Sequence, residues 1–199
     1  MAFSSSEGKR LFYDWAFHFM AAGHIKSAFD VGAGAGAYAK LLHEIAGEVE
    51  QWQPSIITDL KIDCSEVFNP YISKYNLGII YNNIYADDIE NILDSIENYD
   101  LIIMGDVLEH MEKDKAIRVF NALKKKCKFL WLSIPVQPFK SWSNGYNQLA
   151  DEWQENPANE HLHYWTFHEL HAELGPFLWS VPFPVVTVLI AEGELNASV

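Results

Sequence analysis

Runs of mostly apolar residues alternate with amphipathic stretches over much of this chain. The runs Ala28–Val31, Tyr99–Met104 and Phe129–Ile134 are typical of strands covered on both faces, as in a parallel sheet. Elsewhere apolar residues recur at intervals of three and four, which predicts helices with one buried face: Tyr38, Leu41, Leu42 and Ile45; Ile89, Ile92, Leu93 and Ile96; and Ala116, Ile117, Phe120 and Leu123. Strands that alternate with helices in this way predict an α/β fold.

The two ends of the chain extend this pattern. Apolar residues at helical spacing predict a leading helix over about residues 9–24. Helical character returns near Phe167, and two further strands are expected at residues 177–179 and 185–191.

The pattern is weaker between the first helix and residue 90. A third strand is expected at residues 79–85, although the polar pair Asn82-Asn83 weakens it. Residues 47–59 are polar and look irregular, so the pattern does not mark where the second strand ends.

Three glycines, Gly32, Gly34 and Gly36, follow the first strand directly. Glycine allows a positive φ and a close approach of a ligand, and the helix that follows would direct its free N–H groups at that ligand, so the loop predicts a cofactor cradle. A P-loop would need a lysine and a hydroxyl next, but Ala37 and Tyr38 stand there, so nucleotide hydrolysis is not expected. The dinucleotide fingerprint can be placed on Gly32, Gly34 and Ala37, which leaves an NAD-type site open.

Acidic residues at two strand ends narrow the choice of cofactor. Asp30 precedes the glycines, and Gly105–Asp114 (GDVLEHMEKD) follows the fourth strand. Together with Asp30–Gly36, this stretch resembles motifs of class I S-adenosylmethionine-dependent methyltransferases, over about residues 10–192. The resemblance implies a doubly wound, mostly parallel, seven-stranded Rossmann-like sheet with helices on both faces and an antiparallel last strand. It also implies S-adenosylmethionine as methyl donor and S-adenosylhomocysteine as product.

The resemblance also assigns site residues. In that family the glycine loop holds the methionine part of the cofactor, an acid after the second strand bonds the ribose, and an acid after the third strand bonds the adenine amino group. The residues implied to bind the cofactor are Asp30, Gly32, Ala33, Gly34, Gly36, Glu66, Asp87, Asp88, Asp106, Val107 and Leu108.

Two of these assignments have alternatives. Glu66 begins EVFNPYI, which is similar to the strand-to-helix junction of some bacterial and phage methyltransferases, so it is preferred over Asp63 as the ribose ligand. Asp88 fits the adenine position better than Asp87, and both are also good helix N-caps.

Residues 136–166 form a long, aromatic insertion, which predicts a substrate lid. Its end, NPANEHLHYWT, resembles a pattern in some small-molecule and saccharide-type methyltransferases. His161 and His163 would point the same way in an extended segment, and either is a candidate base, with His163 preferred; Asp106 is the other catalytic candidate. The alternative for the histidines is a structural role beside Trp165. No zinc site is expected, because no third ligand has a suitable spacing.

Composition limits the remaining possibilities. The chain has 199 residues, 49% of them hydrophobic, which suits one domain. A net charge of −13 argues against partners such as nucleic acid or an anionic membrane, and the basic run at residues 124–126 is expected to be a solvated helix end. Cys64 and Cys127 are far apart, as in a reducing compartment. The chain has no signal-peptide pattern and no membrane-spanning run, so a cytoplasmic location is expected.

These observations predict a methyltransferase acting on a small-molecule or saccharide-type acceptor. The alternatives are an NAD-type oxidoreductase and a binding module of the same fold without catalysis. The expected organisation is one domain over residues 1–199: a leading helix at 9–24, a core at 25–135, the lid at 136–166, and a closing helix and strands at 167–192.

Overall fold

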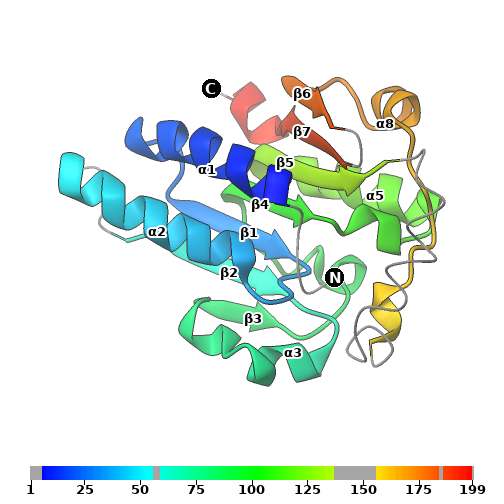
Figure 1. Ribbon diagram of the computed structural model, residues 1–199, viewed down its shortest axis with the longest axis horizontal. Helices are drawn as coiled ribbons and strands as arrows, with labels where there is room; N and C mark the ends of the chain where they lie inside the picture. Colours follow the sequence, from blue (N-terminus) through cyan, green and yellow to red (C-terminus); the bar gives the residue numbers. More distant parts are fainter. Residues whose placement is uncertain (1–5, 56–58, 137–155, 184–185, 199) are drawn as a thin grey trace.

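A seven-stranded sheet with helices on both faces organises the computed structural model (Figure 1). The structure describes residues 6–55, 59–136, 156–183 and 186–198. The strands are β1 (Ser27–Val31), β2 (Lys61–Ser65), β3 (Asn83–Tyr85), β4 (Tyr99–Gly105), β5 (Cys127–Pro135), β6 (Trp179–Pro182) and β7 (Val186–Glu192). The helices are α1 (Ser6–Ala21), α2 (Ala37–Trp52), α3 (Asn69–Lys74), α4 (Ile89–Ile92), α5 (Lys113–Lys124) and α8 (Phe167–Glu173).

The strand order is β3-β2-β1-β4-β5-β7-β6. The first five strands are parallel, while β7 runs antiparallel to both β5 and β6. The order reverses at β1, the point where open sheets of this kind place their ligands. This arrangement confirms the predicted α/β fold with an antiparallel closing hairpin.

Two hydrophobic cores lie on opposite faces of the sheet. On one face α1 and α2 pack through Phe12, Met20 and Leu42 against the sheet (Figure 1). On the other face α4, α5 and α8 contribute Ile92, Phe120, Leu170 and their neighbours. Because both faces are covered, the side chains of β4 are buried almost along its whole length, which explains its continuous apolar run.

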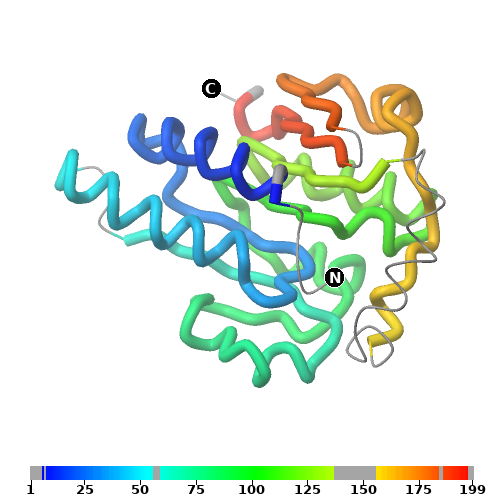
Figure 2. The backbone as a smooth tube through the Cα atoms, in the orientation of Figure 1, coloured from blue at the N-terminus to red at the C-terminus, as the bar shows by residue number. Residues whose placement is uncertain are grey.

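The carboxyl ends of β1, β2 and β4 meet short turns and the segment before α8. The 3₁₀ turns are η1 (Leu77–Ile79), η2 (Leu108–His110), η3 (Pro157–Asn159) and η4 (Glu194–Ser198). Figure 2 shows the chain around η3 passing these strand ends before it continues into α8. Val136 and Trp165 pair in an isolated bridge, and Thr166 and Glu169 form a capping box that starts α8.

Two local boundaries, the end of α2 and the start of β3, differ clearly from the sequence-based expectations. Helix α2 continues through Gly47 to Trp52, because Ala46 and Val49 keep its apolar face buried and outweigh the weak helix propensity of glycine. The third strand has only three residues, since η1 occupies the start of the expected range. Most of the expected lid, residues 137–155, lies outside the described residues.

Gly105 and Gly47 give a matched test of the packing. A Cβ on Gly105 would clash with the ring of Tyr38, whereas a Cβ on Gly47 has no atom within 4 Å. We expect Gly105→Ala to lower the free energy of unfolding by about 1–3 kcal/mol through overpacking. Gly47→Ala should raise it by about 0.5–1 kcal/mol, because alanine favours the helix. Urea unfolding of both variants measures these effects; equal stability of the two would contradict the packing described here.

Candidate functional site

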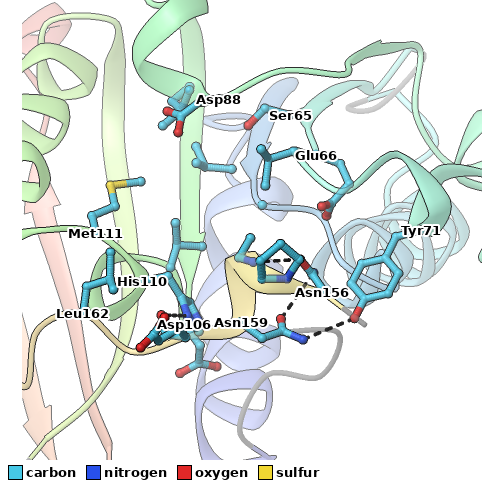
Figure 3. Close-up of a pocket in the computed structure, with 18 of the residues that line it drawn as sticks. Ser65, Glu66, Tyr71, Asp88, Asp106, His110, Met111, Asn156, Asn159 and Leu162 are labelled. Carbon is cyan, nitrogen blue, oxygen red and sulfur yellow. Dashed lines mark hydrogen bonds between the residues drawn. The ribbon is translucent and has the colours of Figure 1, made fainter. Parts of the chain in front are cut away.

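A cavity of about 320 Å³ opens at the carboxyl ends of β1, β2 and β4 (Figure 3). Its volume lies at the lower end of the range of about 300–1,000 Å³ typical of small-molecule sites. Most charged side chains in its lining are acidic: Glu66, Asp87, Asp88, Asp106 and Glu160. The lining also includes one lysine, Lys115. The cavity is therefore suited to a cationic or hydroxyl-rich ligand rather than to an anion.

The glycine loop lines the cavity through Gly32, whereas Ala33, Gly34 and Gly36 are not among the lining residues. Gly32, Gly34 and Gly36 have φ angles of 68°, 53° and 71°, in the region that favours glycine. A Cβ on Gly32 would come within 3.0 Å of the side chain of Val107, so the turns after β1 and β4 pack tightly together. Helix α2 begins directly after this loop, which directs its amino end toward the strand ends.

Glu66 is the first residue after β2 and is buried beside the loop. One carboxylate oxygen accepts the N–H of Gly34 at 2.7 Å, and the other accepts the N–H of Phe68 at 2.8 Å. Each oxygen has further acceptor capacity, so Glu66 can hold the loop and still receive a ligand hydroxyl.

Asp63, the alternative to Glu66, has a different environment. It lies within β2, where its carboxylate accepts the hydroxyl of Tyr99 at 2.6 Å and the backbone N–H of Asn83 at 3.0 Å. It is not among the residues that line the cavity. These contacts favour a structural role for Asp63.

Asp30, expected to help hold the methionine part, also does not line the cavity. Its buried carboxyl accepts the hydroxyl of Tyr81 at 2.6 Å. Burial raises the pKa of Asp30 to about 7, with the Tyr81 hydrogen bond opposing this rise and the nearby Glu66 adding to it. These contacts favour a structural role for the carboxyl of Asp30, in a hydrogen bond with Tyr81.

Asp87 and Asp88 follow β3 and line the cavity. Asp88 is the N-cap of α4, and its carboxylate accepts a hydrogen bond from the N–H of Glu90 at 2.9 Å. The same carboxylate forms an ion pair with Lys115 at 2.6 Å. Asp87 accepts the N–H of Asp88 and the amide of Asn91. The capping and cavity-lining positions predicted for this pair thus coincide in Asp88.

Asp106 follows β4 at the point where the strand order reverses. Its φ of 56° is unusual for a residue with a side chain, and its carboxylate accepts the hydroxyl of Ser133 at 3.1 Å. Asp106 and Val107 line the cavity, whereas Leu108 is fully buried in the core. Figure 3 shows Asp106 and His110 on one side of the cavity and Glu66 and Tyr71 on the other.

The segment around η3 closes the cavity opposite the glycine loop. Asn156 and Asn159 are buried there, with an amide contact of 3.4 Å between them and a contact of 3.5 Å from Asn159 to the hydroxyl of Tyr71 (Figure 3). Leu162 and Met111 add an apolar edge. This wall combines amide groups with apolar area, as a small polar substrate requires.

His161 and His163 have different neighbours, because the chain there is not a regular strand. The ring of His163 contacts Trp165 at 4.7 Å and Glu169 at 3.2 Å. The ring of His161 lies 4.8 Å from that of His110. Neither His161 nor His163 lines the cavity, while His110 does.

The sequence motifs did not single out Glu109 and His110, although both lie in the GDVLEH stretch. Burial and the nearby Asp106 raise the pKa of Glu109 well above its usual value. Burial lowers the pKa of His110 to about 3 and also lowers that of His161. The signal that could have drawn attention to them is the pairing of an acid and a histidine directly after a strand end that binds ligands.

A family model described as a methyltransferase domain matches residues 9–175. The chain belongs to this methyltransferase family. No curated protein matches its sequence. The prediction of the class I S-adenosylmethionine-dependent family, with S-adenosylmethionine as its cofactor, is confirmed at the level of the family.

Several solved structures share the fold of this methyltransferase. The N-terminal domain of EvdMO1 with bound S-adenosylhomocysteine is 13% identical, with a TM-score of 0.62 over 96% of this chain and 82% of that chain. Magnesium protoporphyrin IX methyltransferase from Synechocystis PCC 6803 is 14% identical, with a TM-score of 0.56 over 94% and 80%. The trans-methyltransferase CalH is 16% identical, with a TM-score of 0.61 over 92% and 58%.

The described part of the methyltransferase has no helix with the length and apolar character needed to cross a bilayer.

The pKa of Asp30 predicts a pH dependence of stability. The pKa of Asp30 rises from 3.8 in the unfolded chain to about 7 in the fold. Its protonated form therefore contributes to the free energy of unfolding in full below pH 3.8, and this contribution is lost as the pH rises through 7. We expect the contribution of Asp30 to the free energy of unfolding to fall over this window by a few kcal/mol, at about 1.4 kcal/mol per pKa unit.

Asp30→Asn should flatten that slope, since asparagine does not ionise. Urea unfolding at several pH values compares the variant with the wild type. An unchanged slope between pH 4 and 7 would show that Asp30 titrates normally in the fold.

Proposed function

We propose that the protein transfers the methyl group of S-adenosylmethionine to a small-molecule or saccharide-type acceptor. The observation that carries this proposal is the acidic cavity at the carboxyl ends of the strands, in which the carboxylate of Glu66 accepts a hydrogen bond from the N–H of Gly34. When bound, S-adenosylmethionine supplies an activated methyl group on a sulfonium. The protein then has to position this donor and an acceptor in line, which is the main source of catalysis in such reactions.

The residues present fit this cofactor. The carboxylate of Glu66 can accept the ribose hydroxyls, and Asp88 can accept the adenine amino group, while the positive-φ loop from Gly32 to Gly36 leaves backbone room for the methionine part. Asp106 and the backbone of Val107 and Leu108 would lie toward the transferred methyl group. The negative lining also complements a ligand that carries a sulfonium and an ammonium.

The same lining argues against the NAD-type alternative. A pyrophosphate needs free N–H groups in the glycine loop, but the N–H of Gly34 is donated to the carboxylate of Glu66. Lys115 lines the cavity, yet it is paired with Asp88 at 2.6 Å. A phosphate placed there would meet carboxylates without a compensating cation.

The wall around η3 is the proposed acceptor side. Asn156 and Asn159 offer amide groups, and Leu162 and Met111 offer apolar contact. EvdMO1 was crystallised in the presence of S-adenosylhomocysteine and D-fucose, and other proteins of this fold are named as a mitomycin 7-O-methyltransferase and a porphyrin methyltransferase. Those names support a small acceptor, and a sugar or phenol hydroxyl suits the polar wall described here.

Proton removal from the acceptor is proposed to involve Asp106, because its carboxylate lines the cavity and is held by Ser133. His161 and His163, the sequence-based candidates, lie outside the lining. We therefore assign them positioning roles: His163 acts on α8 through Glu169, and His161 acts through the ring of His110.

Calorimetric titration tests the cofactor. S-adenosylmethionine and S-adenosylhomocysteine should bind saturably at one site, whereas NADH should give no heat beyond dilution, because the carboxylate of Glu66 already accepts the N–H of Gly34 and would repel a pyrophosphate. Saturable NADH binding without a response to either sulfur compound would reverse the proposal. Cofactor binding with no methyl transfer to any member of a phenol, sugar and amine panel would favour a binding module.

A pair of isosteric variants tests the ribose ligand. Glu66→Gln removes the charge from the oxygens that hold Gly34 and, by proposal, the ribose; charge-assisted hydrogen bonds contribute about 1.5–3 kcal/mol each, so S-adenosylhomocysteine should bind at least about tenfold more weakly. Asp63→Asn, matched in chemistry and burial, should change the dissociation constant less than about threefold. Exchanged effects would make Asp63 the ligand.

A further inference from the structure

Three polar side chains converge beside the cavity, from parts of the chain that lie far apart in sequence. Glu109 and His110 come from η2, and His161 comes from the segment after η3. One ligand-type atom from each, a carboxylate oxygen and two ring nitrogens, lies within 4.8 Å of the others. Backbone hydrogen bonds hold the two segments together: the carbonyl of Glu109 accepts the N–H groups of Leu162 at 2.8 Å and of His163 at 3.2 Å.

The hydrogen bonding of His110 fixes which ring nitrogen is free. Its Nδ1 lies 3.0 Å from the carbonyl oxygen of Glu160. A carbonyl only accepts hydrogen bonds, so Nδ1 must carry the proton and the neutral ring presents a bare lone pair at Nε2. A backbone carbonyl that orients the second nitrogen in this way is the usual support of a metal-binding histidine.

The atoms that face the centre of this cluster have no other partner. Nε2 of His110, Nε2 of His161 and both carboxylate oxygens of Glu109 are buried without a hydrogen bond from another residue in the described part of the chain. Glu109 is only 1% exposed, and its Oε1 lies 3.7 Å from Nε2 of His110, too far for a hydrogen bond. Leaving four such acceptors unpaired in the interior is unfavourable, and all four belong to three side chains of the kinds that bind metal cations.

We propose that Glu109, His110 and His161 bind one divalent transition-metal ion, such as Zn²⁺ or Mn²⁺. Two imidazoles and one carboxylate on one side of an ion leave the other positions open. Ligand atoms at about 2.0–2.2 Å from one ion are separated by about 3–3.5 Å. The 3.7 Å between Glu109 and His110 is close to this separation, and the nitrogen of His161 lies within 4.8 Å of both.

The ion would lie at the edge of the cavity, because His110 lines it while Glu109 and His161 lie behind. Its open positions would then face the wall around η3, where an acceptor oxygen could bind and become easier to deprotonate. This consequence rests on the proposed function, whereas cation binding itself does not. The spacing argument against a metal site considered only neighbours of His161 in sequence, whereas the other two ligands come from η2.

Cobalt titration tests the site, with protein that carries no polyhistidine tag and has been treated with a chelator. One equivalent of Co²⁺ should produce visible d–d absorption that saturates, and Zn²⁺ should displace it. Glu109→Gln, His110→Ala and His161→Ala should each raise the dissociation constant for Co²⁺ at least about tenfold. His168→Ala, an exposed histidine on α8, is the matched control and should leave it unchanged.

Several outcomes would overturn the proposal. Absence of saturable absorption at one equivalent of Co²⁺ in the wild-type protein would by itself disprove the site. The test therefore does not depend on whether a variant folds. Equal loss in His168→Ala would mean adventitious surface binding, and loss in His163→Ala alone would place the ion at Glu169. Titration of S-adenosylhomocysteine in the presence of chelator separates the two proposals, because cofactor binding that persists there supports the methyltransferase function whether or not cobalt binds.

Discussion

The buried carboxylate of Glu66 is the contact on which the shape of the pocket depends. It receives the N–H of Gly34 at 2.7 Å and that of Phe68 at 2.8 Å, and so joins the turn after β1 to the chain after β2. Each of these charge-assisted bonds contributes about 1.5–3 kcal/mol. The same contact withdraws a backbone donor that would otherwise attract a phosphate. One side chain therefore both shapes the glycine loop and places a negative charge in the cavity lining.

A second set of contacts governs the opposite wall. The carbonyl of Glu109 and the ring of His110 are hydrogen bonded to residues 160–163, so η2 and the segment before α8 form one unit beside Asp106. The end of β4 thus carries both Asp106, which lines the cavity, and the turn that holds the wall around η3. Because both follow the same strand, a shift in β4 would move the two walls together rather than apart.

Sequence reasoning succeeded where the signal is local. The buried runs of β4 and β5 and the glycine loop follow from the residues themselves, since each is a short stretch with its own pattern. It failed where contacts are distant: Asp30 turns to Tyr81, 51 residues away, and His161 meets His110, and no periodicity encodes either pairing. The end of α2 was predicted too early, at Gly47, because the burial of Val49 continues the helix beyond it.

The bridge between Val136 and Trp165 has a consequence for how such a protein can diversify. Trp165 is fully buried, so the chain leaves the sheet after β5 and returns to the same place. With both anchors fixed, the closure entropy of a chain segment between them grows only with the logarithm of its length, about 0.6 kcal/mol for each doubling. Under the proposed function, related chains with segments of other lengths between these anchors could accept other substrates without a large cost to the stability of the sheet.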